Sequence, residues 1–297
     1  MVSVAELTVP GRTLVMGIVN VTADSFSDGG RWLDVDAALG HARELVALGA
    51  DIIDVGAEST RPGATRVPAE VEAQRIRPVI EGLHAEGIRT SVDTMRASTA
   101  AVAAEAGVDL INDVSAGLAD PDMYRVMAES RLPVCLMHWR TDVFVSAAGA
   151  SDHGGDVTSD VHALLERCID DAIAAGVERS QIVVDPGLGF AKTAEENWAL
   201  LASLPDFIAG EFPVLVGASR KRFLTAIRAG RGLDHGPIDA DPATAAVTAI
   251  SAQMGAWCVR VHEVAASRDA VDVAAAWNQA ANQAANQARD QRGGGRG

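Results

Sequence analysis

Residues 51–94 read DIIDVGAESTRPGATRVPAEVEAQRIRPVIEGLHAEGIRTSVDT and contain a strand, a loop, a helix and a second strand. The apolar, β-branched runs at 51–56 and 89–94 have strand character. Between them lies an amphipathic stretch at 69–87 that opens beside Pro68, as helices commonly do. Strands that are apolar on both faces are typical of a parallel sheet covered by helices. This stretch therefore predicts an α/β fold.

The same alternation of strand and helix extends along the chain. Strand character recurs at 14–20, 51–56, 89–94, 110–115, 133–138, 182–187, 213–219 and 257–262. Eight such units favour closure as a (β/α)₈ TIM barrel over an open sheet. We predict a lead-in at 1–13, a single barrel domain at 14–279 and a polar, Gly-rich disordered tail at 280–297.

Composition and charge restrict the partners of the chain. A formal net charge of −15 argues against non-specific binding to nucleic acid or to anionic membranes, since both need a basic surface. The sequence has neither a signal-peptide pattern nor an uninterrupted apolar run of membrane-spanning length, so we expect a cytoplasmic protein. The three cysteines, Cys135, Cys168 and Cys258, lie in apolar surroundings and are expected to be buried, reduced thiols.

Polar side chains stand where the predicted strands end, which is where barrels of this class place their active sites. The candidates are Asn20, Asp93, Asn112, Asp185, Ser219, Lys221, Arg260 and His262. A charge inside an apolar strand is costly unless it is paired or bound. We therefore expect Asp93, Asp185 and Arg260 to have partners, of which a ligand is one.

Each of these residues also has a purely structural interpretation. A single aspartate at a strand end is more often a helix cap or a turn former, and Asp54 and Asp113 fit that interpretation. His138 can equally pack beside its neighbour, so we leave it out of the site. The basic run 220–222 could be a solvated helix start, but positive charge is unfavourable at a helix N-terminus, and a nearby anion explains the run better.

Two loops have a composition that an ordinary surface turn does not need. NVTADSFSDGG at 20–30 places hydroxyls, carboxylates and glycines around Phe26, and STRPGATR at 59–66 combines hydroxyls with a rigid turn and arginines. Such segments suit a flap that closes over a charged substrate and excludes water.

At these residues the sequence resembles the dihydropteroate synthase family. The first loop is part of MGIVNVTADSFSDGG (16–30), which resembles one family signature, and ESTRPGA (58–64) resembles another. The segments VDT, IND, DPGLGF, GASRKRF and RVH follow in the family's order, one strand apart. The likeness spans roughly Val15 to Trp277, with small departures at Ala23, Ala57 and Ala116.

The resemblance implies condensation of 6-hydroxymethyl-7,8-dihydropterin diphosphate with 4-aminobenzoate, with release of diphosphate and help from Mg²⁺. It implies catalytic roles for Asp93, Asp185, Lys221 and Arg61. The pterin would be bound by Asp93, Asn112, Asp185 and Lys221, and the diphosphate by Asn20, Arg61, Arg260 and His262. The residues implied for 4-aminobenzoate are Thr60, Arg61, Pro62, Phe190, Ser219 and Lys221. Asp24, Ser25, Phe26 and Ser27 would form the flap, and Asn20 would contact the metal.

The resemblance also implies a dissociative displacement, ordered binding with pterin diphosphate first, a homodimer and a sulfonamide target. Two other functions stay open from the residues alone. One is a pterin-binding methyltransferase that passes a methyl group from methyltetrahydrofolate to a corrinoid protein, and the other is a pterin-binding paralogue without turnover. The methyltransferase would not need Phe26 and Arg61 together with Arg260 and His262, whereas the paralogue would be expected to lack Lys221, Arg61 or Asn20.

Overall fold

The computed structural model describes residues 3–21, 30–58, 67–141 and 151–293. Within them, eight parallel strands form one sheet in the order β6-β5-β4-β3-β2-β1-β8-β7. The strands are β1 (Leu14–Asn20), β2 (Ile52–Gly56), β3 (Thr90–Asp93), β4 (Leu110–Asp113), β5 (Val134–Met137), β6 (Ile182–Asp185), β7 (Leu215–Val216) and β8 (Cys258–Val261). A parallel bridge between Val184 and Val214 brings the two edge strands together. The predicted (β/α)₈ barrel is confirmed.

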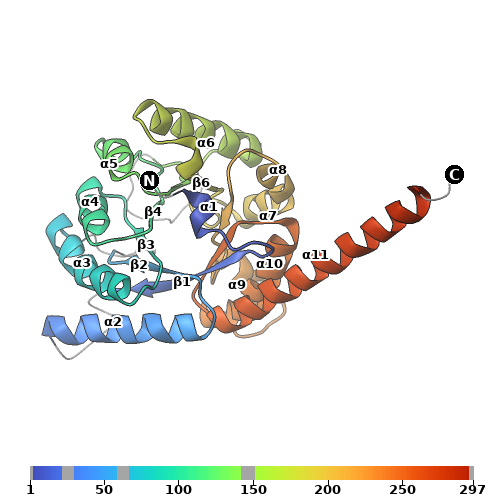
Figure 1. Cartoon of the computed structure of the whole chain (residues 1–297), viewed down its shortest axis with the longest axis horizontal. Coiled ribbons are helices and arrows are strands. Elements are labelled where there is room, and N and C mark those ends of the chain that lie inside the picture. Colours follow the sequence, from blue (N-terminus) through green and yellow to red (C-terminus); the bar gives the residue numbers. More distant parts are fainter. Residues whose placement is uncertain (1–2, 22–29, 59–66, 142–150, 294–297) are drawn as a thin grey trace.

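Helices surround the strands on the outside of the barrel, except for the first helix, which covers one end of it (Figure 1). They are α1 (Val4–Leu7), α2 (Gly30–Ala47), α3 (Ala69–Ala85), α4 (Ala97–Glu105), α5 (Met123–Ser130), α6 (Val157–Ala174), α7 (Ala194–Ala202), α8 (Leu204–Ile208), α9 (Arg222–Gly230), α10 (Asp241–Met254) and α11 (Val264–Gly293). Short 3₁₀ turns lie at η2 (Arg179–Gln181) and η3 (Ile238–Ala240). None of the helices in the described part of the chain is long and apolar enough to cross a membrane.

The inside of the barrel changes from apolar to polar along the strands. Leu14, Leu110, Cys135, Val183 and Cys258 belong to one buried cluster, which Val4 and Leu7 of α1 also join. Successive side chains of a strand point to opposite faces, so the residue two positions later points inward again. From Leu110, Val183 and Cys258 this alternation leads to Asn112, Asp185 and Arg260. The strands therefore present polar groups together at their carboxyl ends.

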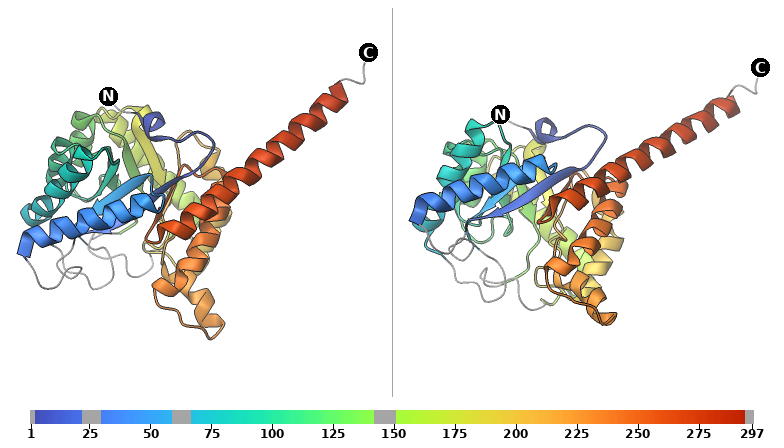
Figure 2. Two further views of the ribbon diagram at one scale, coloured as in Figure 1. Left: turned by 60° about the horizontal axis from the view of Figure 1, so that its bottom comes forward. Right: turned by 90° about the horizontal axis from the view of Figure 1, so that it is seen from below.

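One sequence-based expectation agrees with the structure, and another differs from it. The cysteines are free and buried, as predicted. The segment 280–293, which we predicted as part of a disordered tail, is helical and continues α11. Its alanine-rich NQAANQA repeat favours a helix, because alanine has the highest helix propensity. This end of α11 projects away from the barrel (Figure 2), and the side chains of 281–287 are exposed.

Candidate functional site

A cavity of about 430 Å³ lies at the carboxyl ends of the strands. The nine candidate residues that fall in the described part of the chain all line it. They are Asn20, Asp93, Asn112, Asp185, Phe190, Ser219, Lys221, Arg260 and His262. The remaining candidates, Asp24, Ser25, Phe26, Ser27, Thr60, Arg61 and Pro62, lie outside the described residues. Side chains from strands far apart in sequence thus meet at one place.

Arg260 of β8 finds its partners in two other strands. Its Nε donates to Asp54 Oδ2 over 2.6 Å and its Nη2 donates to Asp93 Oδ2 over 2.7 Å. Asp54 is fully buried, and Asn112 Nδ2 lies 3.4 Å from its Oδ2. Burial raises the pKa of Asp93, although the charge of Arg260 opposes the shift. Two of the three guanidinium nitrogens thus hold carboxylates, which leaves Nη1 for a further anion.

The expected role of Arg260 and the structural interpretation of Asp54 both need refinement. We assigned Arg260 to the diphosphate, whereas its contacts are with Asp54 and Asp93. Asp54 is not a helix cap: it lies buried inside the barrel beneath the cavity, which it does not itself line, and pairs there with Arg260. Asp113 does have the predicted structural role, since its carboxylate accepts hydrogen bonds from the backbone of Ser115 and Gly117.

A second carboxylate, Asp185, stands at the end of β6 and is 5 % exposed. Its Oδ1 accepts a hydrogen bond from the Gly187 amide over 2.7 Å. Burial raises the pKa of Asp185, while that hydrogen bond and the charge of Lys221 oppose the increase. The hydrogen bond fixes one oxygen on the protein, so the other is available for hydrogen-bond donors in the cavity.

Lys221 lies beside the turn that follows β6. Its Nζ is 4.0 Å from the centre of the Phe190 ring. Burial lowers its pKa to about 8, although Asp185 opposes the shift. Gly189 has a φ of +75°, and a Cβ there would lie 2.5 Å from Lys221 Cδ. Glycine at this position therefore leaves room for the lysine to lie across the turn.

The basic run 220–222 lies at the start of α9, next to the cavity. Arg220 has a left-handed φ of 58° and makes two hydrogen bonds of 2.8 Å to the carboxylate of Asp241. The anion that we inferred near this run is therefore not needed to explain Arg220. All three residues of the run, Arg220, Lys221 and Arg222, line the cavity, but only Arg220 is paired with Asp241 in this way.

Ser219 and His262 join the ends of β7 and β8. The Ser219 hydroxyl accepts a hydrogen bond from the His262 backbone amide over 3.1 Å, and it lies 3.1 Å from His262 Nδ1. In the tautomer whose Nδ1 accepts from this hydroxyl, the imidazole has its own proton on Nε2. Such an Nε2–H group is a hydrogen-bond donor suited to an anionic ligand.

Sequence reasoning missed an ion-pair network behind Glu58, which lines the cavity. Arg96 Nη2 donates to Glu58 Oε2 over 2.7 Å and to the Val67 carbonyl over 2.8 Å, and its Nη1 pairs with Glu72. The Thr94 hydroxyl donates to the same Glu72. Arg96 thus holds the residues on both sides of 59–66. Glu58 belongs to the ESTRPGA motif, which marks this segment in the sequence, but the motif gives no indication that Arg96 is the partner of Glu58.

Three comparisons with known proteins agree with this geometry. Residues 16–262 match the family model described as pterin binding enzyme. The chain is 50% identical over 264 residues to a dihydropteroate synthase of Mycobacterium leprae, with 89% of this chain and 93% of the relative covered.

Solved structures agree as well. The dihydropteroate synthase of Xanthomonas albilineans with 4-aminobenzoic acid has a TM-score of 0.79 and 43% identity, over 88% of this chain and 92% of that one. The same enzyme in complex with 7,8-dihydropteroate has a TM-score of 0.76 and 40% identity, over the same shares.

Proposed function

The chain belongs to the dihydropteroate synthase family of pterin-binding enzymes, and from this premise we propose that it condenses 6-hydroxymethyl-7,8-dihydropterin diphosphate with 4-aminobenzoate. The products are 7,8-dihydropteroate and diphosphate. One observation carries the proposal: the buried carboxylate of Asp185 and the ammonium of Lys221 share a cavity with Arg260 and His262. A recognition site for a polar heterocycle thus lies beside hydrogen-bond donors for an anion.

The pterin ring is assigned to the buried end of the cavity. Its 2-amino-pyrimidinone edge offers adjacent N–H donors, and the open oxygen of Asp185 can accept from them. Asn112 and Asp93 can pair with the remaining ring nitrogens, and Lys221 can donate to the ring carbonyl and N5. An analogue without this edge would leave buried polar groups unpaired, which supports selective binding.

The departure of diphosphate separates charge, and the site has groups for both signs. As the C–O bond breaks, positive charge spreads over the pterin, where Asp93 and Asp185 can stabilise it. Arg260 acts partly through Asp93, which it holds in place, and partly through its remaining nitrogen on the diphosphate. His262 can donate to the same anion. The electron pair of the broken bond leaves with the diphosphate oxygen.

The arylamine of 4-aminobenzoate is a weak nucleophile, so its placement matters more than its activation by a base. We assign Ser219 to its carboxylate and Phe190 with Lys221 to the walls of its pocket. Thr60, Arg61 and Pro62 are proposed for the same pocket, and Asp24, Ser25, Phe26 and Ser27 for the flap over it. Because this pocket depends on both loops, pterin diphosphate is expected to bind first.

We propose that Mg²⁺ assists the reaction. Asn20 is half-buried at the end of β1 and offers one carbonyl oxygen to the cavity. A single neutral oxygen is a weak ligand, which suits an ion held mainly by diphosphate oxygens and water. The ion would neutralise charge on the leaving group. Turnover is expected to fall when Mg²⁺ is removed, and Asn20→Ala is expected to raise the Mg²⁺ concentration needed for half-maximal rate.

We also propose a cytoplasmic homodimer, in which the thiols stay reduced. Val273 and Trp277 of α11 are 64% and 65% exposed, and a second copy could cover them. Light scattering on the purified protein measures the mass of the assembly, and a mass of one chain would contradict the dimer.

Turnover of the purified protein tests the main proposal. The protein is incubated with Mg²⁺, pterin diphosphate and 4-aminobenzoate, and dihydropteroate and diphosphate are measured. Equal amounts of both products are expected. No dihydropteroate at saturating substrates would refute the proposal and favour a pterin-binding paralogue, whereas methyl transfer from methyltetrahydrofolate to a corrinoid protein would favour the methyltransferase.

A further inference from the structure

Lysine is rare in this chain, and one of its lysines is buried outside the site described above. Only Lys192 and Lys221 are lysines among the 25 basic side chains. Lys221 lines the cavity, whereas Lys192 does not, although Lys192 is only 5 % exposed. A buried lysine is uncommon because removing an ammonium from water is costly. Its retention here requires a specific reason.

Burial lowers the pKa of Lys192 to about 7, although the charge of Asp185 opposes the shift, and below that pH its ammonium has a complete set of partners. Nζ lies 2.9 Å from the Gly187 carbonyl, 3.2 Å from the Phe190 carbonyl and 2.9 Å from His138 Nδ1. An ammonium has three N–H donors, so each donor has one acceptor. Three acceptors around a single nitrogen suit this compact group better than the planar guanidinium of arginine. The side chain thus clamps both ends of the turn 187–190.

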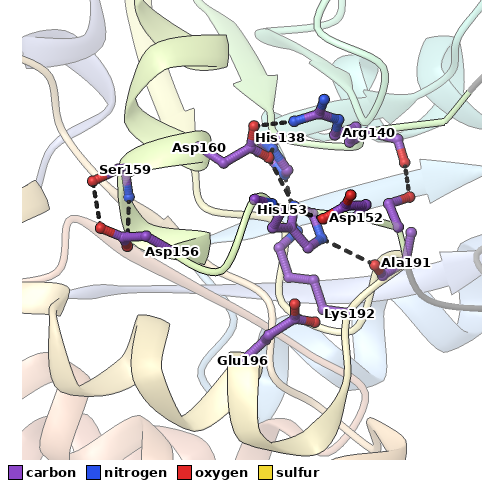
Figure 3. A network of polar contacts seen from close by, with 12 residues as sticks. His138, Arg140, Asp152, His153, Asp156, Ser159, Asp160, Ala191, Lys192 and Glu196 are labelled. Atoms are coloured by element: carbon purple, nitrogen blue, oxygen red, sulfur yellow. Dashed lines mark hydrogen bonds and ion pairs between the residues drawn. The ribbon is translucent and has the colours of Figure 1, made fainter.

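Lys192 contacts the imidazole of His138, and this ring lies close to Asp160 of α6 (Figure 3). Burial, together with the nearby Lys192 charge, lowers the pKa of His138 to about 3, so its imidazole is neutral. His138 Nε2 lies 3.5 Å from Asp160 Oδ2 but makes no hydrogen bond, so the contact of the ring with Lys192 is through Nδ1. Asp160 in the first turn of α6 also pairs with Arg140 and with His153 Nδ1. His153 Nε2 lies 3.2 Å from the Ala191 carbonyl, so His153 links α6 to the residue that follows the turn 187–190.

The clamped turn forms one wall of the cavity. The amide of Gly187 is the donor to Asp185, and a Cβ on Gly187 would lie 1.9 Å from the carbonyl oxygen of His138, so this backbone packs directly against the residue that follows β5. The ring of Phe190 lies under Lys221 Nζ and packs edge-on against Trp139 at 5.1 Å. The position of the turn thus sets two contacts that the proposed reaction uses.

A metal ion is a less suitable explanation of the same cluster. His138, His153 and Asp160 offer three possible ligand atoms within 4.8 Å of one another. However, the guanidinium of Arg140 already pairs with Asp160, and the ammonium of Lys192 is 2.9 Å from His138. Both cations would repel a divalent ion at that point. The hydrogen bonds to the two carbonyls also have no part in a metal site.

We propose that Lys192 is a positioning residue: its ammonium fixes the carbonyls of Gly187 and Phe190, and so sets where the Asp185 carboxylate and the Phe190 ring stand in the cavity. The kinetic consequences rest on the proposed function, whereas the structural consequence does not. If the clamp is removed, the turn is free to shift, and the Phe190 ring is expected to leave its place under Lys221.

The two-lysine composition gives a direct test by nuclear magnetic resonance. Protein labelled with ¹³C,¹⁵N-lysine has only two sets of side-chain signals, and the ring of Phe190 should shift the Lys221 signals upfield. In Lys192→Met one set remains, and it is expected to move toward the position of free lysine. Gln181→Met is the matched control, because Gln181 is also buried and donates to a carbonyl, that of Leu132, but at the start of β6. Both sets should stay unchanged in this control.

Kinetics provide a second readout on the same variants. A small misplacement of reacting groups can reduce rates by about 10- to 100-fold, and we expect a loss of that size in kcat/KM for Lys192→Met. Gln181→Met should stay within about twofold of the wild type. Because Lys192 acts partly through Phe190, the effect of Lys192→Met should shrink in a Phe190→Ala background, as a double-mutant cycle would show.

The outcomes separate this inference from the proposed function. If Lys192→Met does not fold, Lys192→Arg keeps the charge but lacks the compact donor, and the same loss of the upfield shift is expected. A folded variant at position 192 with wild-type Lys221 signals and wild-type kcat/KM would overturn the inference. Absence of turnover in the wild type would instead refute the proposed function, and the signals of Lys221 would still decide the role of Lys192.

Discussion

Replacing Asp185 with asparagine probes the recognition of the pterin with little change in shape. Asparagine can keep the hydrogen bond from the Gly187 amide, which now spans 2.7 Å. Its amide nitrogen would then occupy the position of the other carboxylate oxygen and present donors to the donors of the pterin. The side chain is only 5 % exposed, so water offers little compensation. The variant therefore removes the acceptor and leaves buried donors unpaired.

The magnitude follows from the hydrogen bonds that are lost. A hydrogen bond to a charged group contributes about 1.5–3 kcal/mol, so the loss of at least one should weaken binding by about 2 kcal/mol or more. This corresponds to an increase in Kd of about 30-fold. Titration calorimetry with pterin diphosphate measures the change.

Asp113→Asn is the matched control for this experiment. Asp113 is a buried carboxylate at the end of β4, which β5 separates from β6, but its contacts are with Ser115 and Gly117 and it does not line the cavity. This control should lower stability and leave the Kd nearly unchanged. An unaltered Kd in Asp185→Asn would refute the assignment of Asp185 to the pterin.

Three further predictions test other parts of the site. Arg61→Ala should leave pterin diphosphate binding nearly intact and reduce turnover by about 100-fold or more, and unchanged turnover would remove Arg61 from the site. Burial lowers the pKa of Lys221 to about 8 and the pKa of Lys192 to about 7, so kcat/KM should fall as the pH rises through these values and the two lysines lose their protons; in Lys221→Arg the step near pH 8 should disappear while the step near pH 7 remains. Arg260→Met should destabilise the fold by about 3 kcal/mol or more, because Asp54 and Asp93 stay buried without their partner. Burial raises the pKa of Asp93 and the charge of Arg260 opposes that shift, so without Arg260 this carboxyl binds a proton more readily and thermal unfolding should show a smaller loss at pH 5 than at pH 8; an equal loss at both would contradict the pairing.

The barrel and the location of the site follow from local sequence patterns. Each strand is a short apolar run, and β1 begins and ends where predicted. The inward candidates, such as Asn112 and Asp185, follow inward apolar residues by two positions, so the alternation of a strand brings them to one face. Because all the strands are parallel, their ends meet at the same mouth. The barrel and the location of the site can therefore both be derived from the sequence.

Partner choice could not be derived in the same way. Arg260 was expected to need a partner, but its pairing with Asp54, 206 positions earlier in the chain, depends on how the barrel closes. The same holds for Arg220, which is satisfied by Asp241 of α10. The buried Lys192 falls just after the DPGLGF motif and gave no signal of its own. Charged residues reveal that a partner is required, but only the fold identifies it.

A structure of the protein with bound pterin diphosphate tests the central claim most directly. The account predicts the ring within hydrogen-bond distance of Asp185, Asn112 and Lys221, with the diphosphate toward His262 and the mouth of the barrel. A pterin bound elsewhere on the molecule, or one in the cavity that contacts none of these three side chains, would contradict it.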